Sequence, residues 1–250
     1  MKKFEFTGET QMWCGYTLRR IRALVDIPTH CVKKGDLGGW IEKDKNLSHD
    51  GNAWVYGDAR VCGDAQVFGD ARVCGDARVC DNALVCGNAL VYGKAWVYGN
   101  AWVYGDARVY GNARVYGDAW VYYNAQAYGN AWVYGDAQVY GNALVCGNAW
   151  VFGNARVFGN ARVFGNARVF DDARILANAH YLTIGPIGSR GNTTTFYISK
   201  SKKIMVVCGC FYGDIDTFAE KVKAVHGDSK HAKAYLAAIE LAKIQIAIEN

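Results

Sequence analysis

Residues 51–62 read Gly-Asn-Ala-Trp-Val-Tyr-Gly-Asp-Ala-Arg-Val-Cys, which is one six-residue unit written twice. The unit continues without insertion to residue 182, giving twenty-two copies. Position one is Gly in eighteen copies, position two is Asp or Asn in all but one, position three is always Ala, and position five is Val in nineteen. Only positions four and six vary freely, so the constant positions carry the information for the fold.

The hexad pattern predicts short strands joined by tight corners. Alternation along a strand places Ala and Val on one face and positions four and six on the other. Gly followed by Asp or Asn tolerates left-handed backbone and forms the corner. Three hexads close a triangular coil of eighteen residues, and stacked coils form in-register parallel sheets around Ala and Val. The twenty-two hexads predict a little over seven coils, about 35 Å long at ~4.8 Å per coil.

The chain divides into three parts around this repeat. Residues 1–50 are expected to form an N-terminal β cap, because strand-like stretches at 17–27 and 35–41 precede the first hexad and a solenoid needs its raw end covered. Residues 51–182 form the solenoid. Residues 183–250 are expected to fold as a small ββαα domain, with strands over 193–200 and 203–210 and helices over 214–226 and from 229 to about 249. The fold class is therefore mainly β, with a small α+β domain at the end.

Composition narrows the classes of protein. An apolar content of 51% excludes a disordered chain, and a net charge of +5, spread around the repeat, does not call for nucleic acid. No apolar run has the length of a membrane span, and none follows the first lysines as in a signal peptide. Five of the nine cysteines stand at position six, where they exchange with Tyr and Phe. Together these observations favour a protein of the reducing cytoplasm that has no membrane partner.

Residues eighteen apart stack on one wall of the predicted solenoid, which creates columns of outward side chains. One wall carries Tyr98, Tyr116, Tyr134, Phe152 and Phe170 beside a column of Trp96, Arg114, Trp132, Trp150 and Arg168. The second column favours cation–π stacking. In one interpretation the ladders only stabilise a thin sheet. In the other, an interface for a homo-oligomer (a trimer or a dimer) or for another protein is formed by Trp96, Arg114, Trp132, Trp150, Tyr98, Tyr116 and Tyr134.

A glycine-rich link at residues 185–195 is the candidate ligand site. It offers backbone N–H groups, the guanidinium fork of Arg190 and the hydroxyls of Ser189, Thr193 and Thr194. These groups suit a phosphorylated small molecule or a nucleotide. The alternative is a flexible hinge with one exposed arginine, and the spacing matches no phosphate-loop motif.

Residues suited to catalysis or metal binding are sparse. His180 is the only histidine of the repeat, at the outward position four of the last copy, where a lone histidine is more often a solvated side chain than a general base. Cys208 and Cys210 share one face of a predicted strand, and no second pair of ligands stands at a zinc-site spacing. The Asp residues at position two exchange with Asn and are turn formers. The sequence therefore predicts no catalytic residue, metal or cofactor.

Two segments resemble known proteins. The hexads, together with Lys-Gly-Asp-Leu-Gly-Gly-Trp-Ile-Glu at 34–42 and Asn-Leu-Ser-His at 46–49, resemble the YdcK-type hexapeptide-repeat proteins of enterobacteria and their phages. Residues 181–190 (Tyr-Leu-Thr-Ile-Gly-Pro-Ile-Gly-Ser-Arg) and the Cys-Gly-Cys-Phe of 208–211 resemble a C-terminal module common in bacteriophage and prophage proteins. The first resemblance implies a left-handed parallel β-helix and carries an acyltransferase label. Enzymes of that superfamily usually present a loop that protrudes from the solenoid, whereas these hexads are uninterrupted.

These observations favour a non-enzymatic binding protein encoded by a phage or prophage. Its partner would be a host protein or a nucleotide-type ligand, as in countering a defence protein or sequestering its nucleotide signal. Two alternatives stay open. The first is an acyltransferase that uses a CoA thioester, with His180 or a C-terminal histidine in a cleft between subunits. The second is a structural or virion-associated protein.

Overall fold

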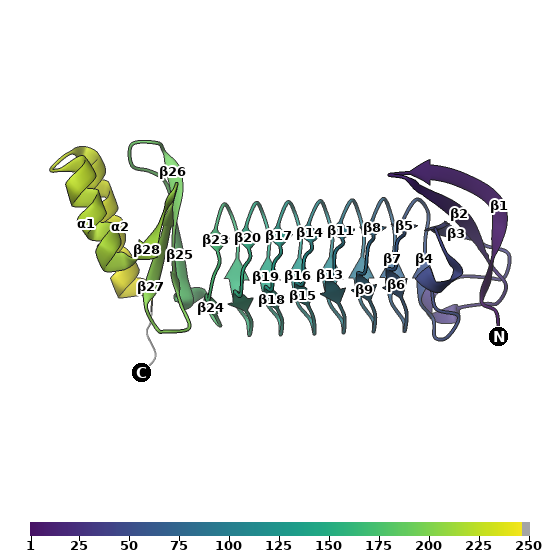
Figure 1. Ribbon diagram of the computed structural model, residues 1–250. Coiled ribbons are helices and arrows are strands. Elements are labelled where there is room, and N and C mark those ends of the chain that lie inside the picture. Colours follow the sequence, from purple (N-terminus) through teal and green to yellow (C-terminus); the bar gives the residue numbers. More distant parts are fainter. Residues whose placement is uncertain (247–250) are drawn as a thin grey trace.

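The computed structural model describes residues 1–246, so the predicted helix end near residue 249 lies outside the described residues. The molecule is an elongated solenoid with a β cap at the N-terminal end and an α+β module at the C-terminal end (Figure 1). Each hexad from residue 51 to residue 176 contributes one two-residue strand at positions four and five. Each strand pairs in parallel with the strand eighteen residues away, as Trp96 does with Arg114. The parallel β-solenoid predicted from the hexads is confirmed.

The strands form three walls. The first wall consists of β5 (Arg60–Val61), β8 (Arg78–Val79), β11 (Trp96–Val97), β14 (Arg114–Val115), β17 (Trp132–Val133), β20 (Trp150–Val151) and β23 (Arg168–Val169). The second wall consists of β6 (Gln66–Val67), β9 (Leu84–Val85), β12 (Trp102–Val103), β15 (Trp120–Val121), β18 (Gln138–Val139), β21 (Arg156–Val157) and β24 (Arg174–Ile175). The third wall consists of β4 (Trp54–Val55), β7 (Arg72–Val73), β10 (Leu90–Val91), β13 (Arg108–Val109), β16 (Gln126–Ala127), β19 (Leu144–Val145) and β22 (Arg162–Val163).

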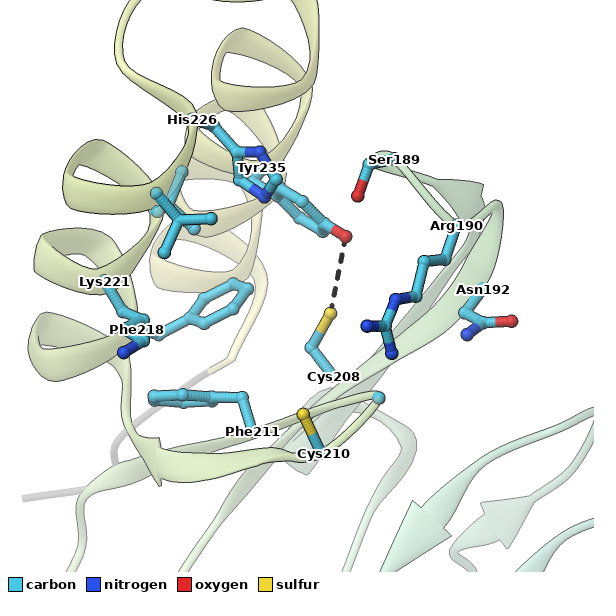
Figure 2. Close-up of a pocket in the computed structure, with 13 residues that line it drawn as sticks. Ser189, Arg190, Asn192, Cys208, Cys210, Phe211, Phe218, Lys221, His226 and Tyr235 are labelled. Atoms are coloured by element: carbon cyan, nitrogen blue, oxygen red, sulfur yellow. Dashed lines mark hydrogen bonds between the residues drawn. The ribbon is translucent and has the colours of Figure 1, made fainter.

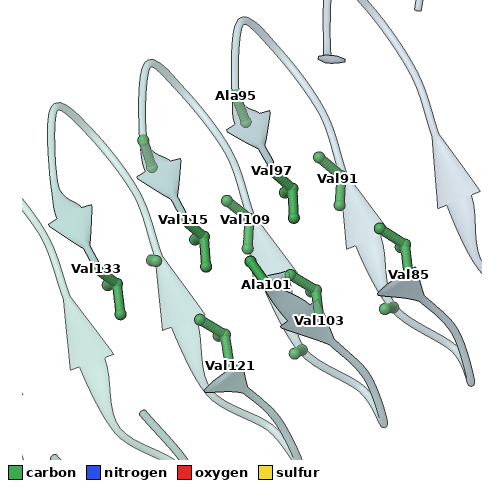
Figure 3. Close-up of a cluster of buried hydrophobic side chains, with 14 of the residues drawn as sticks. Val85, Val91, Ala95, Val97, Ala101, Val103, Val109, Val115, Val121 and Val133 are labelled. Carbon is green, nitrogen blue, oxygen red and sulfur yellow. The ribbon is translucent and has the colours of Figure 1, made fainter. Parts of the chain in front are cut away.

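Small and β-branched side chains fill the prism between the walls. The alanines and valines at positions three and five are fully buried, and the valines of successive coils lie in rows (Figure 3). At the corners from residue 51 to residue 171, position one has a positive φ whether or not it is glycine: φ is 69° at Gly99 and 56° at Tyr123. A Cβ at Gly99 would stand 2.9 Å from the backbone nitrogen of Gly117 in the next coil. Glycine therefore serves both the corner conformation and the close stacking of coils.

The solenoid begins before the first hexad. Strand β3 (Leu37–Ile41) places Ile41 opposite Val61, and Leu47 forms a bridge with Val67. The first wall therefore has eight parallel strands, and the solenoid has about eight turns. Two short 3-10 helices, η1 (Pro28–His30) and η2 (Asp44–Asn46), lie in the connections. An antiparallel hairpin of β1 (Phe4–Trp13) and β2 (Tyr16–Ala23) extends the first wall beyond β3, and β1 was not predicted.

The twenty-second hexad does not form a further strand and corner of the solenoid, which corrects the prediction for residues 177–182. These residues form the 3-10 helix η3 (Asn178–His180) and the start of β25 (Tyr181–Ile187). His180 therefore does not stand at an outward position: its side chain is only 9% exposed, and its Nδ1 accepts a hydrogen bond of 3.3 Å from the backbone N–H of Leu176. The last hexad lacks the leading glycine that makes the corner in most other copies.

The C-terminal module has four strands rather than the two expected. Its antiparallel sheet runs in the order β25, β26 (Asn192–Ile198), β27 (Ile204–Cys208) and β28 (Phe211–Asp214). Helices α1 (Ile215–His226) and α2 (Lys230–Gln245) follow, with Asp214 and Ser229 as their N-caps. Figure 1 shows the sheet between the helices and the last coil. The glycine-rich link of 185–195 is therefore the β25–β26 hairpin.

The direction of the backbone ladder decides what covers each end. Within the stack, N–H groups donate to the following coil, as from Trp96 to the carbonyl of Ala113. The last coil therefore leaves donors: the N–H of Arg168 donates to Thr195 Oγ1 at 3.1 Å, and that of Arg162 to Asn178 Oδ1 at 2.8 Å. The first coil leaves acceptors, and the buried Nζ of Lys3 donates to the carbonyl of Ala53 at 2.8 Å. Each end thus receives the complementary polar group.

In the part of the chain that the structure describes, no helix has the length and apolarity needed to cross a membrane.

Candidate functional site

The predicted ligand residues lie at the tip of the β25–β26 hairpin and along β26. Ser189 and Arg190 are exposed in the turn that joins the two strands. Thr193 is half-buried, and Thr194 is fully buried. The four residues therefore do not form one open cluster. The hairpin also replaces the hinge that was the alternative interpretation.

A cavity of about 210 Å³ lies between this hairpin tip, the β27–β28 turn and the two helices (Figure 2). Two aromatic rings, Phe211 and Phe218, form part of its wall, with ring centroids 4.9 Å apart. Its polar lining includes Ser189, Arg190, Asn192, Lys221, His226 and Tyr235. None of the described residues that line it is an Asp or Glu. The cavity therefore combines an aromatic surface with cationic and hydrogen-bond-donating side chains.

A chain of hydrogen bonds ends at the cavity. The hydroxyl of Thr194 donates to Cys208 Sγ at 3.3 Å. The Cys208 thiol in turn donates to Tyr235 Oη at 3.6 Å (Figure 2). Burial, followed by the neighbouring Cys208, raises the pKa of Tyr235 to about 12. The phenol is therefore protonated at neutral pH. Because its oxygen accepts from the thiol, its O–H remains to donate to a ligand.

Glycine at position 188 brings the hairpin onto Tyr235. Gly188 has a φ of +74°, and a Cβ built there would overlap the hydroxyl and ring of Tyr235. The backbone of the turn thus lies directly on the ring, and Arg190, two residues later, extends toward the cavity in Figure 2. Within residues 1–246, none of the ion pairs involves Arg190 or Lys221. Both cations are free to meet an anion.

Several of these lining residues were not recognised in the sequence as functional. Phe218 and Tyr235 have the helical spacing of a core stripe and are indeed buried, at 4% and 6% exposure. Only the fold shows that the Tyr235 hydroxyl reaches a cavity. Lys221 and His226 look like ordinary solvated positions on a helix.

The structure also corrects the placement of the two cysteines. Cys208 ends β27 and pairs with Phe211, which leaves Gly209 and Cys210 as a two-residue turn. The thiols therefore do not share a strand face: Cys208 takes part in the hydrogen-bond chain and Cys210 is exposed. Within the described residues, no group of three His, Cys, Asp or Glu side chains could hold a metal ion.

The aromatic columns form on the first wall as the sequence indicated. Tyr98, Tyr116 and Tyr134 stack with centroids 4.8 Å apart, and the rings of the column are half-buried by one another. The Arg114 guanidinium lies over Trp96 at 5.4 Å and over Trp132 at 5.0 Å, and Trp132 stacks on Trp150 at 5.0 Å. The predicted cation–π contacts are therefore present. These contacts support the stabilising role of the ladder, and a partner at this wall stays a prediction.

Comparison with known proteins gives a result for the solenoid. The model of the YdcK beta solenoid repeat matches residues 65–81, 77–93, 85–99, 107–123, 137–153 and 155–169. The repeats are of the YdcK type. The matched residues all lie within the hexad region and make up less than half of the chain, so they concern the scaffold and not the cavity. No curated protein matches the chain.

Proposed function

We propose that this chain is a non-enzymatic binding protein of phage or prophage origin that acts in the host cytoplasm. In this proposal the YdcK-type solenoid is a rigid scaffold, and the C-terminal module binds a small ligand of nucleotide type. Such a protein could counter a host defence by sequestering a nucleotide signal. The resemblance of residues 181–190 and 208–211 to a phage module supports the origin. The chemistry of the cavity supports the ligand class.

One observation carries the ligand class. Arg190 and the Tyr235 hydroxyl converge on a cavity that has two phenylalanine rings in its wall and no acidic side chain among its described lining. A phosphate suits the guanidinium fork and the phenol donor, and a flat base suits the half-buried ring of Phe211. A purely apolar ligand would leave the cationic and phenolic groups without partners, which is costly for groups removed from water.

The test is calorimetric titration of the full chain with the four common nucleoside 5′-monophosphates. Arg190→Gln removes the charge and should weaken binding about tenfold to a hundredfold, because a hydrogen bond to a charged group contributes roughly 1.5–3 kcal/mol. Tyr235→Phe keeps the ring and removes the donor, so a smaller loss is expected. Arg108→Gln, an exposed arginine on the third wall, is the matched control. Dissociation constants that Arg190→Gln does not change, or no binding of any monophosphate below about 1 mM, would reject the proposal.

The aromatic wall adds a second proposal about assembly. We propose that the chain forms a trimer or dimer through Trp96, Arg114, Trp132, Trp150, Tyr98, Tyr116 and Tyr134. Light scattering behind size exclusion would measure the mass of the particle. A particle of one chain at concentrations well above those in the titration would rule this out, and it would leave the ligand proposal untouched.

A further inference from the structure

A second cavity, of about 310 Å³, lies where the first wall meets the C-terminal module. The solenoid contributes Asn148, Trp150, Asn166 and Arg168 to its lining, and the module contributes residues of β26 and β27 that include Thr193 and Thr195. Two hydrogen bonds join the last coil to β26 at this junction. The N–H of Arg168 donates to Thr195 Oγ1, and Tyr197 Oη donates to the carbonyl of Phe170 at 3.1 Å.

This cavity collects hydrogen-bond donors because the solenoid ends there. Asparagine amides at position two form a ladder in which each Nδ2 donates to the next Oδ1, from Asn130 to Asn148 at 3.0 Å and from Asn148 to Asn166 at 3.1 Å. Asn166 is the last member, and its Nδ2 has no hydrogen-bond acceptor among residues 1–246. The amide of Asn166, at the end of the ladder, is therefore a hydrogen-bond donor available at the cavity.

Arg168 supplies the charge. Its guanidinium lies over Trp150 at 5.0 Å, at the end of the Trp/Arg column, and no described residue forms an ion pair with it. The described lining contains no Asp or Glu. Trp150 is stacked on Trp132 on its other side, so its ring faces are already covered. The cavity therefore suits an anionic group held by donors, and it does not suit a flat ring stacked on tryptophan.

The two cavities adjoin each other. Asn192 and Gly209 line both of them. Figure 2 shows the Arg190 side chain directed toward the first cavity and the Asn192 side chain directed away from it. Ligand pockets for small molecules commonly measure roughly 300–1,000 Å³. The first cavity is below that range and the second is at its lower end, so neither alone encloses a large ligand.

We infer that the two cavities act as one bipartite site for a small molecule with two anionic groups, such as a linear dinucleotide. One base lies against Phe211 with its phosphate at Arg190. The second phosphate lies at Arg168 and the terminal amide of Asn166. This inference rests on the proposed nucleotide binding by the first cavity. It adds that the end of the solenoid takes part in recognition and selects for a second charge.

The experiment compares adenosine 5′-monophosphate with the linear dinucleotide pApA on the full chain. The unmodified protein should bind pApA at least tenfold more tightly than the monophosphate. Arg168→Gln should reduce that preference to threefold or less. Arg108→Gln is the matched control, because Arg108 is exposed on the third wall, outside both cavities and outside the proposed oligomer interface, so the preference should remain. Arg190→Gln should weaken both ligands.

The outcomes separate this inference from the proposed function. If the monophosphate binds through Arg190 but Arg168→Gln leaves the preference for pApA unchanged, the bipartite site is wrong and the first site stands. If the unmodified protein binds the monophosphate and pApA with equal affinity, the bipartite site is also wrong and the first site stands. A phosphorylated octa-adenylate that binds more tightly than pApA would also overturn the inference, because the ligand would then be a nucleic-acid strand. If no nucleotide binds, the proposed function itself fails.

Discussion

At the scale of single residues, the candidate site depends on one glycine. Gly188 combines a φ of +74° with a position directly on Tyr235. Gly191, in the same turn, also has a positive φ of +58°, but a Cβ there would meet only Pro186, at 3.8 Å. An alanine at either position would have to adopt the left-handed conformation, but only an alanine at Gly188 would also clash with Tyr235.

Gly188→Ala is expected to displace the turn and lower the affinity for a nucleoside monophosphate by tenfold or more. Gly191→Ala should cost only the left-handed conformation, roughly 1–2 kcal/mol of stability, and should leave the affinity within about threefold. Thermal melts and calorimetric titration of both variants provide the measurement. Equal affinities for the two variants would show that the contact with Tyr235 does not shape the site.

The sequence indicated part of this candidate site and not the rest, for a physical reason. Ser189 and Arg190 were recognisable because a charged fork among glycines has few structural uses. Tyr235 was not, since a ring at a helical core spacing looks the same whether its hydroxyl reaches a buried partner or a cavity. Thr194 was predicted to bind the ligand, but its side chain is buried and hydrogen-bonds to Cys208, which in turn donates to Tyr235.

At the scale of elements, the hexads predicted β4 to β24 because every strand repeats one pattern. Strand β25 was missed because its first two residues, Tyr181 and Leu182, complete what reads as a hexad, and the rest contains Gly185 and Pro186. Strand β28 was missed because it is short and leads straight into α1. The hexad pattern predicted strands correctly only where three consecutive hexads form a complete coil.

The stacked tyrosines give the walls a dependence on alkaline pH. Burial, followed by the stacked neighbours, raises the pKa of Tyr116 and Tyr122 to about 12, against 10.0 for a free tyrosine. Below about pH 9 these tyrosines are neutral in both the folded and the unfolded chain, so they contribute no pH dependence. Between pH 10 and 12 the unfolded chain ionises first, which favours unfolding.

We therefore expect the free energy of unfolding to fall from pH 10 to 12. Denaturant melts at each pH, with tyrosinate absorbance recorded alongside, would show this. Tyr122→Phe should make the decline shallower, because Phe already occupies the same kind of position at Phe158 and stacks at 5.1 Å. A decline of unchanged steepness in that variant would argue that other groups are responsible.

At the scale of the whole molecule, the coil is the unit of length. Each coil contacts its neighbours through the same parallel pairs, so the stability of such a stack is close to a sum over coils and their interfaces. Removing residues 105–122 deletes one coil and rejoins Tyr104 to Tyr123 in frame. The last coils and the C-terminal module keep all their contacts.

The protein lacking residues 105–122 should fold cooperatively, be about 5 Å shorter by small-angle scattering, and bind nucleotide with unchanged affinity. The comparison is a deletion of residues 105–119, which breaks the hexad frame and places corner residues inside strands. Circular dichroism should show folded protein for the first deletion and loss of the β signal for the second. If the protein lacking residues 105–122 folds but does not bind nucleotide, the middle of the solenoid contacts the ligand.

The complementary ends have a consequence for self-assembly. A stack of parallel strands that donates in one direction and accepts in the other can in principle add further copies head to tail, as an amyloid fibril does. Here Thr195 and Asn178 occupy the donors of the last coil, and Lys3 occupies acceptors of the first. The two terminal modules therefore satisfy backbone groups through which a further copy would otherwise pair end to end.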